Sequence, residues 1–347
     1  MQAPRRDPRV TQPRRRHRRR GEYRAETSSL PGSSVSEPLT TSVPLDVPLG
    51  GVWSTLRRRP LVAYFALAFG LSWLVFLPEI LAAWNVVPPG SHAGAVLKQW
   101  VGPGLAGLLM AYAVGGRPGR SALRARVRRW RVGWGWYAVT LVLAPLVVLV
   151  SVVAVVGLPA AVPTVPPTIL VSYLVYLVLV FFGVGLPEEI GWRGFALDRL
   201  QNRYGPLVGT LVLGVLWALW HLPYFLTSDH GGGPGAAWGA VWTNFAIFSG
   251  MVIALSVPMT FVFNRTGGSV LLVALMHASI DTAQLVWLPL LLPVGAETST
   301  TGERQLDLAA LVGFGVTALL LVLFTRGRLG RASRRDALDL SPERTPI

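Results

Sequence analysis

The chain of 347 residues contains about eight long apolar segments, which constrain its fold more than any other feature. A bilayer has a hydrocarbon core about 30 Å thick, so one helical crossing needs roughly 20 mainly apolar residues. The alternating strands of about ten residues that a membrane β-barrel would need do not occur in the sequence. We therefore predict an all-α, polytopic helical membrane protein with about eight transmembrane helices. The apolar segments span approximately residues 61–84, 96–114, 134–156, 169–186, 206–225, 241–263, 270–292 and 308–324.

The composition agrees with a membrane location and excludes several kinds of chemistry. Hydrophobic residues make up 52% of the chain and charged residues 14%, whereas charged residues average about 25% in soluble domains. Cysteine is absent, which excludes disulfides, thiolate metal ligands and cysteine nucleophiles. The first apolar segment is too long for a signal peptide, and we expect it to remain as a transmembrane helix.

The basic residues predict the topology. Among the 32 Lys and Arg residues, all but Lys98 and Arg304 fall in connections on one side of a chain with eight crossings. The positive-inside rule makes that side cytoplasmic. We therefore expect a multi-pass protein of the cell membrane with both termini cytoplasmic. The net charge of +15 then reflects topology, and we expect the lipid bilayer as its partner and no specific nucleic acid.

Composition divides the chain into three regions. Residues 1–57 are rich in Arg, Pro, Ser and Thr without apolar periodicity, and should form a disordered basic cytoplasmic region. Its arginine run at 14–20 is expected to be attracted to anionic headgroups, with RNA binding as the alternative. Residues 58–325 are predicted to form the helical transmembrane domain, and residues 326–347 a basic cytoplasmic tail. Within the domain, apolar residues at helical intervals among arginines predict an amphipathic surface helix at 120–131.

Three short polar motifs lie within or at the ends of apolar segments. Ionisable side chains at membrane depth are costly to bury and are by default candidates for functional groups. Only two of the five histidines lie in apolar segments, and both belong to these motifs. The first motif contains Glu188, Glu189 and Arg193, the second contains Trp217 and His221, and the third contains His277 and Asp281.

Helix geometry separates the two adjacent glutamates. Glu189 and Arg193 are four residues apart, so they share a helix face and can form an ion pair. Glu188 points about 100° away from Glu189 and has no cation on its own helix. We therefore expect Glu189 and Arg193 to support the structure, while Glu188 can hold a proton near neutral pH. The alternative is that both glutamates only cap a helix at the inner interface.

A predicted turn places Glu188 and His221 opposite each other. The Tyr-Gly-Pro sequence at 204–206 predicts a turn, and it lies roughly 16 residues from each of the two side chains. An antiparallel hairpin would bring both to the same depth. His277 and Asp281 are four residues apart on one helix stripe, where the carboxylate can fix the imidazole tautomer or share a ligand with it. The alternative for each histidine is a hydrogen-bonded core residue.

The order and spacing of the three motifs resemble the CPBP family, the CAAX-protease and bacteriocin-processing intramembrane proteases, which include the type II CAAX prenyl endopeptidases. The resemblance covers roughly residues 120–325. It implies an eight-helix fold with a cavity open to the cytosol, in which Glu188 and His221 activate a water. It also implies that His277 and the residue at Asp281 stabilise the oxyanion. The motifs of zincins and of serine hydrolases, His-Glu-x-x-His and Gly-x-Ser-x-Gly, do not occur.

Two departures from the family pattern leave two mechanisms open. The aromatic residue before the first histidine is often Phe in the family and is Trp217 here. The eukaryotic endopeptidases carry Asn where this chain has Asp281, and an aspartate cannot donate to an oxyanion unless it is protonated. Asp281 would serve better as a metal ligand or as the group that orients His277. Glu188, His221, His277 and Asp281 are also a plausible ligand set for a divalent metal such as zinc, so metal-free glutamate catalysis and metal-assisted hydrolysis both remain open.

The motifs and the resemblance together predict an intramembrane endopeptidase that acts on a membrane-associated protein or peptide. Peptide hydrolysis needs an activated water, a general acid for the leaving amine and oxyanion stabilisation, and the four candidate residues supply these roles. One alternative is a proteolytically silent bacteriocin-immunity or scaffold protein, which should have lost a motif residue. The other is a proton-coupled transporter, which should show paired broken helices in its two halves. The sequence shows neither feature.

Overall fold

The computed structural model describes residues 51–88, 93–157, 165–227, 230–287 and 300–331. Within these ranges the chain forms helices and no strand, so the all-α fold prediction is confirmed. Helical structure begins at Val52, six residues before the predicted start of the domain at residue 58. The arginine run at 14–20 and most of the predicted basic tail lie outside the described residues, and those predictions stay untested.

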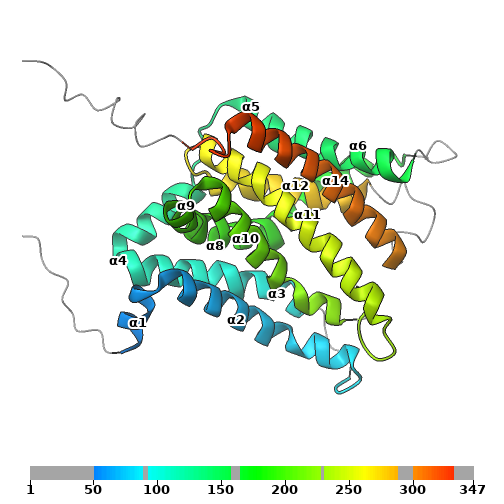
Figure 1. Cartoon of the computed structure of the whole chain (residues 1–347), viewed down its shortest axis with the longest axis horizontal. Coiled ribbons are helices and arrows are strands. Elements are labelled where there is room, and N and C mark those ends of the chain that lie inside the picture. Colours follow the sequence, from blue (N-terminus) through cyan, green and yellow to red (C-terminus); the bar gives the residue numbers. More distant parts are fainter. Residues whose placement is uncertain (1–50, 89–92, 158–164, 228–229, 288–299, 332–347) are drawn as a thin grey trace, which may run out of the picture. The chain divides into compact units, whose positions relative to one another are not determined.

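Figure 1 shows the helices in order along the chain. They are α1 (Val52–Arg58), α2 (Pro60–Ala83), α3 (Ala93–Gln99), α4 (Leu105–Val127), α5 (Trp134–Ala138), α6 (Ala144–Val156), α7 (Ile169–Val180), α8 (Leu186–Gly191), α9 (Asp198–Tyr204), α10 (Pro206–Trp220), α11 (Trp238–Arg265), α12 (Val270–Val286) and α14 (Thr300–Thr325). Wider π-helical turns continue several of them: η1 (Trp100–Gly104), η2 (Val139–Leu143), η3 (Phe181–Gly185) and η4 (Trp192–Leu197). A short 3₁₀ turn, η5 (Leu222–Leu226), follows α10.

Six helical spans in the described residues are long and apolar enough to cross a membrane. They are Pro60–Ala83, Trp134–Val156, Ile169–Tyr204, Pro206–Leu226, Trp238–Arg265 and Arg304–Thr325. Helix α12 is also apolar but shorter, and the predicted segment at 96–114 is divided between α3, η1 and α4. Pro103 lies within η1, and a proline inside a helix removes a backbone donor and clashes with the preceding turn. The prediction of a polytopic helical membrane protein is therefore confirmed, and its second segment contains a π-helical turn.

Helix α4 has a kink at Gly116, whose φ of 58° falls in the left-handed region that favours glycine. The part of α4 after the kink is the amphipathic helix predicted at 120–131. Leu123 is buried there while Arg124 is exposed. The helix ends at Val127, earlier than predicted, and Trp130 is exposed instead of sharing the apolar stripe.

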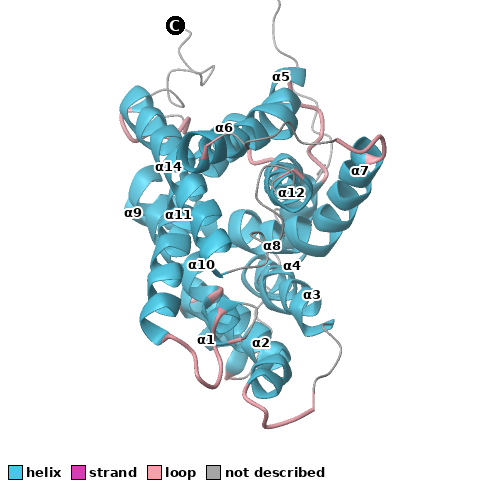
Figure 2. Cartoon of the chain, turned by 90° about the vertical axis from the view of Figure 1, so that its right-hand side faces the viewer, coloured by secondary structure: helices cyan, strands magenta, loops and turns pink. Residues whose placement is uncertain are grey.

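Helix α12 lies in the middle of the bundle. In Figure 2 it is seen nearly end-on, with α6, α7, α8 and α11 arranged around it. All four helices pack against α12, and twelve of its residues are buried. Because other helices surround α12, its polar side chains face the inside of the protein instead of lipid.

The predicted hairpin is present, with α9 ending at Tyr204 and α10 beginning at Pro206. Gly205 between them has a φ of 83°, and Pro206 occupies the first helical position, where its missing N–H costs nothing. On the other arm, glycines allow α8 to approach its neighbours closely. A Cβ at Gly185 would meet the carbonyl of Ala274 on α12, and one at Gly191 would collide with the carbonyl of Pro103.

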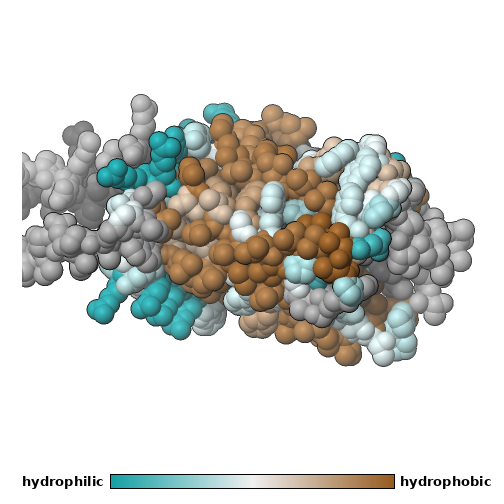
Figure 3. Space-filling view, turned by 90° about the horizontal axis from the view of Figure 1, so that it is seen from below, coloured by the Kyte–Doolittle hydropathy of each residue, from teal (hydrophilic) through white to brown (hydrophobic). Residues whose placement is uncertain are grey.

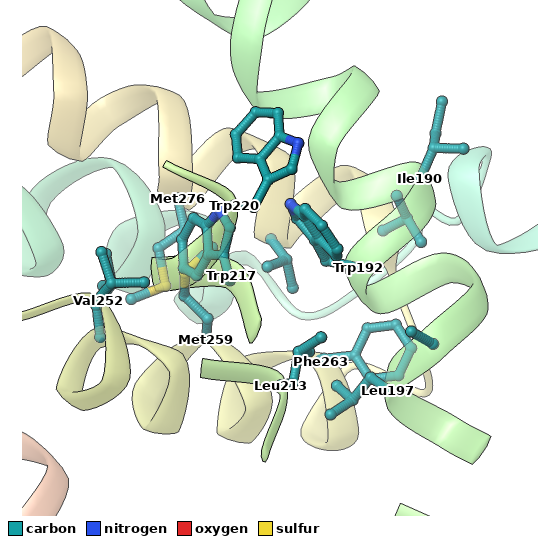
Figure 4. Packing of buried hydrophobic residues seen from close by; sticks show 14 of the residues in the cluster. Ile190, Trp192, Leu197, Leu213, Trp217, Trp220, Val252, Met259, Phe263 and Met276 are labelled. Carbon is teal, nitrogen blue, oxygen red and sulfur yellow. The ribbon is translucent and has the colours of Figure 1, made fainter. Parts of the chain in front are cut away.

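A cluster of buried aromatic and sulfur-containing residues fills the space beside α8 and α10. Figure 4 shows Trp192, Trp217 and Trp220 close together, with Met259 and Met276 next to Trp217. The three tryptophans are at most 2% exposed, and the ring centroids of Trp192 and Trp220 lie 5.7 Å apart in an edge-to-face arrangement. Buried indoles usually donate their N–H groups to an acceptor, and those of Trp192 and Trp217 connect this core to the polar residues beside it.

Candidate active site

Three helices contribute polar side chains to one cavity of about 450 Å³. Helix α8 carries Glu188, the residue that ends α10 is His221, and α12 carries His277 and Asp281. All four line this cavity, so the structure brings together the four residues predicted as catalytic. The remaining lining residues are Gln99, Val184, Trp217, Tyr224, Phe225, His230, Phe248, Met251, Val252, Leu255, Ile280, Gln284 and Leu285.

Two indole groups hold the carboxylate of Glu188. Its Oε2 accepts hydrogen bonds from Nε1 of Trp217 at 2.8 Å and from Nε1 of Trp192 at 3.2 Å. The side chain is 1% exposed. Both donors bind the same oxygen, so neither bond occupies Oε1. The sequence motifs place Trp217 on the His221 stripe without indicating its partner, and they do not single out Trp192, although Trp192 follows Glu188 by four residues.

Glu189 forms the ion pair with Arg193 that the four-residue spacing predicts. Arg193 Nη1 donates to Glu189 Oε1 at 2.7 Å, and both side chains are fully buried. The guanidinium also lies over the ring of Trp217, with Cζ 4.6 Å from the ring centroid. Arg193 therefore connects α8 with the tryptophan that binds Glu188.

Glu189 also contacts the candidate site directly, which the sequence motifs do not predict. Its Oε1 lies 3.1 Å from Nδ1 of His277. Because a carboxylate accepts, Nδ1 of His277 is the donor in this contact. The sequence suggests Asp281 as the group that orients His277, but the nearer carboxylate is that of Glu189. Asp281 Oδ2 lies 3.5 Å from Nε2 of His277, beyond the usual length of an N–H···O bond.

The imidazole of His221 has a defined tautomer. Nδ1 lies 2.9 Å from the carbonyl oxygen of Trp217, and a carbonyl only accepts, so Nδ1 carries the hydrogen. In the neutral ring, Nε2 then carries the lone pair. The ring packs edge-to-face against Trp220 and Phe248, with centroids 4.7 and 5.1 Å away. His221 is thus oriented by its own helix and by aromatic neighbours.

Lys98 lies beside the cavity, a position that the sequence does not predict. The charge distribution assigns it to a connection on the non-cytoplasmic side, but its side chain is 2% exposed. Its ammonium lies over the rings of Tyr224 and Trp220, at 3.2 and 4.4 Å from the centroids. Such cation–π contacts stabilise a desolvated ammonium. Lys98 lies in the last turn of α3, directly before the π-helical turn η1.

The four candidate metal ligands do not converge on one point in the described part of the chain. No group of three or more His, Asp or Glu side chains there has the spacing of a metal site. Nδ1 of His277 donates to Glu189 and Nδ1 of His221 donates to a carbonyl, which leaves Nε2 of each ring as the only nitrogen that could ligate a metal. Oε2 of Glu188 already accepts two indole hydrogens. The arrangement does not fit a zinc site of three protein ligands.

Comparisons with known proteins agree with the family suggested by the motifs. Residues 170–283 match the model of the family described as type II CAAX prenyl endopeptidase Rce1-like. This segment runs from α7 into α12 and contains all of the candidate site residues. A stretch of 42 residues is 43% identical to CAAX prenyl protease 2 of Methanococcus maripaludis. That stretch covers 12% of this chain and 16% of the relative, so the chain spans about a sixth of the curated relative it matches. The suggested resemblance to this family is confirmed.

Proposed function

We propose that this protein is an intramembrane endopeptidase that hydrolyses a peptide bond in a membrane-associated protein or peptide. The observation that carries the proposal is the placement of Glu188, His221 and His277 on one cavity of a helical membrane protein. The match to the type II CAAX prenyl endopeptidase model over these residues supports the same reaction class. No corresponding observation favours an immunity factor, a scaffold or a transporter.

In this proposal Glu188 and His221 activate the attacking water. The indoles of Trp192 and Trp217 fix one oxygen of Glu188 and leave the other for a water in the cavity. The lone pair on Nε2 of a neutral His221 supplies a second base on the same cavity. A pair of proton acceptors can take a proton from the water and return one to the leaving amine, as general acid–base catalysis requires.

His277 supplies the charge that stabilises the oxyanion. A protonated ring donates from Nδ1 to Glu189, and its Nε2–H remains 3.5 Å from Asp281. That distance leaves the Nε2–H available to a substrate oxygen at normal hydrogen-bond length. Asp281 then favours the charged imidazole without donating to the oxyanion itself. This arrangement gives Asp281 a role at a position where the eukaryotic endopeptidases of the family carry Asn.

We propose that the reaction needs no metal ion. The support is that no three of the candidate side chains in the described part of the chain are grouped as metal ligands would be. The hydrogen bonds of the two imidazoles and of Glu188 instead position these groups for proton transfer and hydrogen bonding. Metal analysis of the purified protein tests this part of the proposal separately from the reaction class.

The test of the proposed function is a comparison of membrane proteomes from wild-type and Glu188→Gln cells. We expect at least one membrane-associated precursor to accumulate uncleaved in the variant, because the amide keeps the shape of the side chain but removes the base. Asp307→Asn is the matched control, since it removes a carboxylate from α14, which packs on α6 and α11 instead of on α8. Identical proteomes for Glu188→Gln and wild type, with both proteins present in the membrane, would contradict the proposal.

A further inference from the structure

A second, basic pocket lies at the end of the bundle where α2 begins and α9 ends. It has a volume of about 800 Å³ and is lined by Arg58, Arg59, Arg199 and Arg203 together with Asn202 and Pro60, Leu61 and Val62. Arg58 and Arg59 come from the junction of α1 and α2, whereas Arg199 and Arg203 lie one turn apart on α9. Two segments far apart in the sequence therefore bring four guanidinium groups to one pocket.

These four arginines have no carboxylate partner in the described part of the chain. None forms an ion pair within 4.0 Å of a described carboxylate, although Arg126 nearby pairs with Asp198. Arg199 is held in place, because its Nη1 donates to the carbonyl of Phe195 at 2.6 Å and its guanidinium lies over the Phe195 ring. Like charges gathered in one pocket repel each other, and a bound anion removes that repulsion. The pocket therefore has the charge complementarity of an anion site.

An apolar groove of about 520 Å³ continues from this pocket. The two share Leu61, Val62 and Arg203, and the groove then follows Phe65, Ala66 and Phe69 on one face of α2. Its opposite wall consists of Leu200, Tyr204, Val212 and Leu216 from α9 and α10. From Leu61 to Phe69 the groove runs about 12 Å along the helix axis.

The groove is open on a face of the protein that is mainly apolar. Val62 is 63% exposed and Tyr204 is 45% exposed, so the side chains along the groove are accessible to lipid. In Figure 3 hydrophobic residues cover the middle of the face seen from the α2 side. Strongly hydrophilic residues gather towards the end where α1 and α4 lie in Figure 1. A basic pocket at the boundary of such a band lies at the depth of lipid headgroups.

We propose that the pocket and the groove together bind one anionic phospholipid. The phosphate of its headgroup lies among Arg58, Arg59, Arg199 and Arg203, and an acyl chain follows the groove between α2 and α10. A soluble anion would bind the arginines without filling the apolar groove. A neutral lipid would fill the groove without neutralising the four guanidinium groups. The bound lipid links α2 to the hairpin that carries His221. This site is separate from the cavity of the proposed endopeptidase.

The test uses the purified full-length protein in a neutral detergent, titrated with phosphatidylglycerol, phosphatidylcholine or inorganic phosphate. Native mass spectrometry measures the retained lipid, and thermal unfolding measures stabilisation. We expect one phosphatidylglycerol to be retained with at least about tenfold preference over phosphatidylcholine. Each arginine near an anionic headgroup contributes about fivefold, so Arg58→Gln with Arg59→Gln should weaken retention about 25-fold. Ala66→Trp, which fills the exposed groove, should also weaken retention.

The matched control is Arg124→Gln with Arg128→Gln, which removes two exposed arginines from the same end of the bundle. Its lipid affinity should stay within about twofold of that of the wild type. Equal losses in the control and in the Arg58–Arg59 variant would show that only general surface charge attracts lipid, and would overturn the proposal. The proposal would also be overturned if the wild type retained phosphatidylcholine as well as phosphatidylglycerol, or if Ala66→Trp left phosphatidylglycerol retention unchanged. Stabilisation by inorganic phosphate equal to that by phosphatidylglycerol would overturn it too.

Discussion

The cavity between α8, α10 and α12 and the basic pocket between α2 and α9 use charged residues in opposite ways. In the cavity, Glu188, Glu189 and His277 are at most 5% exposed, and each has hydrogen-bond partners within the protein. In the basic pocket, four arginines line an open hollow without a carboxylate partner among the described residues. A buried charge without a partner carries a large desolvation cost, whereas an accessible charge stays hydrated and can bind a ligand from outside. This difference underlies our proposals of catalysis at the first region and of lipid binding at the second.

The largest expected effect is at Glu188. Glu188→Gln should lower cleavage of a substrate by about 10² to 10⁴-fold, the usual contribution of a positioned general base. The amide can still accept one hydrogen bond from Trp217, so the unfolding temperature should stay close to that of the wild type. Cleavage rates and thermal unfolding, measured on the same preparations, check both statements. Normal cleavage by the folded variant would remove Glu188 from the mechanism.

The next effect is on stability, at the neighbouring glutamate. Glu189→Gln leaves Arg193 fully buried without its anion and weakens the contact with Nδ1 of His277. Removing one partner of a buried pair typically costs about 3–5 kcal/mol, so expression and thermal stability should fall sharply. The control is Asp198→Asn, which removes the partner of Arg126 from a pair with side chains 26–30% exposed. That change should cost less than about 1 kcal/mol. Comparable stability losses in the two variants would show that burial does not distinguish the pairs.

A smaller effect is expected at Asp281, and it separates the two mechanisms. In the metal-free proposal Asp281 only favours a protonated His277 across 3.5 Å, so Asp281→Asn should change cleavage by less than about tenfold. An amide is a poorer metal ligand than a carboxylate, so a metal enzyme should lose metal and activity together. Metal content and cleavage are measured in parallel on both proteins. Stoichiometric zinc in the active wild type, lost with activity in the variant, would contradict the metal-free proposal.

The smallest effect on the protein alone is expected in the basic pocket. Without anionic lipid, Arg58→Gln with Arg59→Gln should change the free energy of unfolding by no more than about 0.5 kcal/mol, because these exposed side chains have no described carboxylate partner to lose. Unfolding in a neutral detergent, with lipid removed, measures this. A loss of several kcal/mol would mean that the arginines already make essential contacts within the protein, and the contrast between the two regions would fail.

Local signals in the sequence predict the features that depend on one helix or one turn. The Gly-Pro turn after Tyr204 follows from backbone geometry, and the Glu189–Arg193 pair follows from the four-residue helical spacing. The helical rise then places Glu188 and His221 at similar distances from the turn. The helices of this hairpin and four of the polar residues that line the cavity could therefore be predicted from the sequence.

Features that depend on how helices cross could not be predicted in this way. The contact between Glu189 and His277 joins residues 88 positions apart, and it requires α8 to lie against α12 at the close approach that Gly185 allows. The burial of Lys98 depends on its packing against the rings of Tyr224 and Trp220, which lie more than a hundred residues further along the chain. The basic pocket likewise needs α9 to lie beside the start of α2. Residue spacing along one helix contains no information about these distances.

The most direct test of the central claim uses the precursor that accumulates in the Glu188→Gln strain. The purified precursor is incubated with wild-type protein in liposomes prepared with a metal chelator and ¹⁸O-labelled water, and the products are weighed by mass spectrometry. The account predicts one cleaved peptide bond with ¹⁸O in the new carboxyl terminus, and no cleavage by Glu188→Gln. An intact precursor after incubation with folded wild-type protein would contradict the claim that this cavity hydrolyses peptide bonds with a water activated by Glu188 and His221.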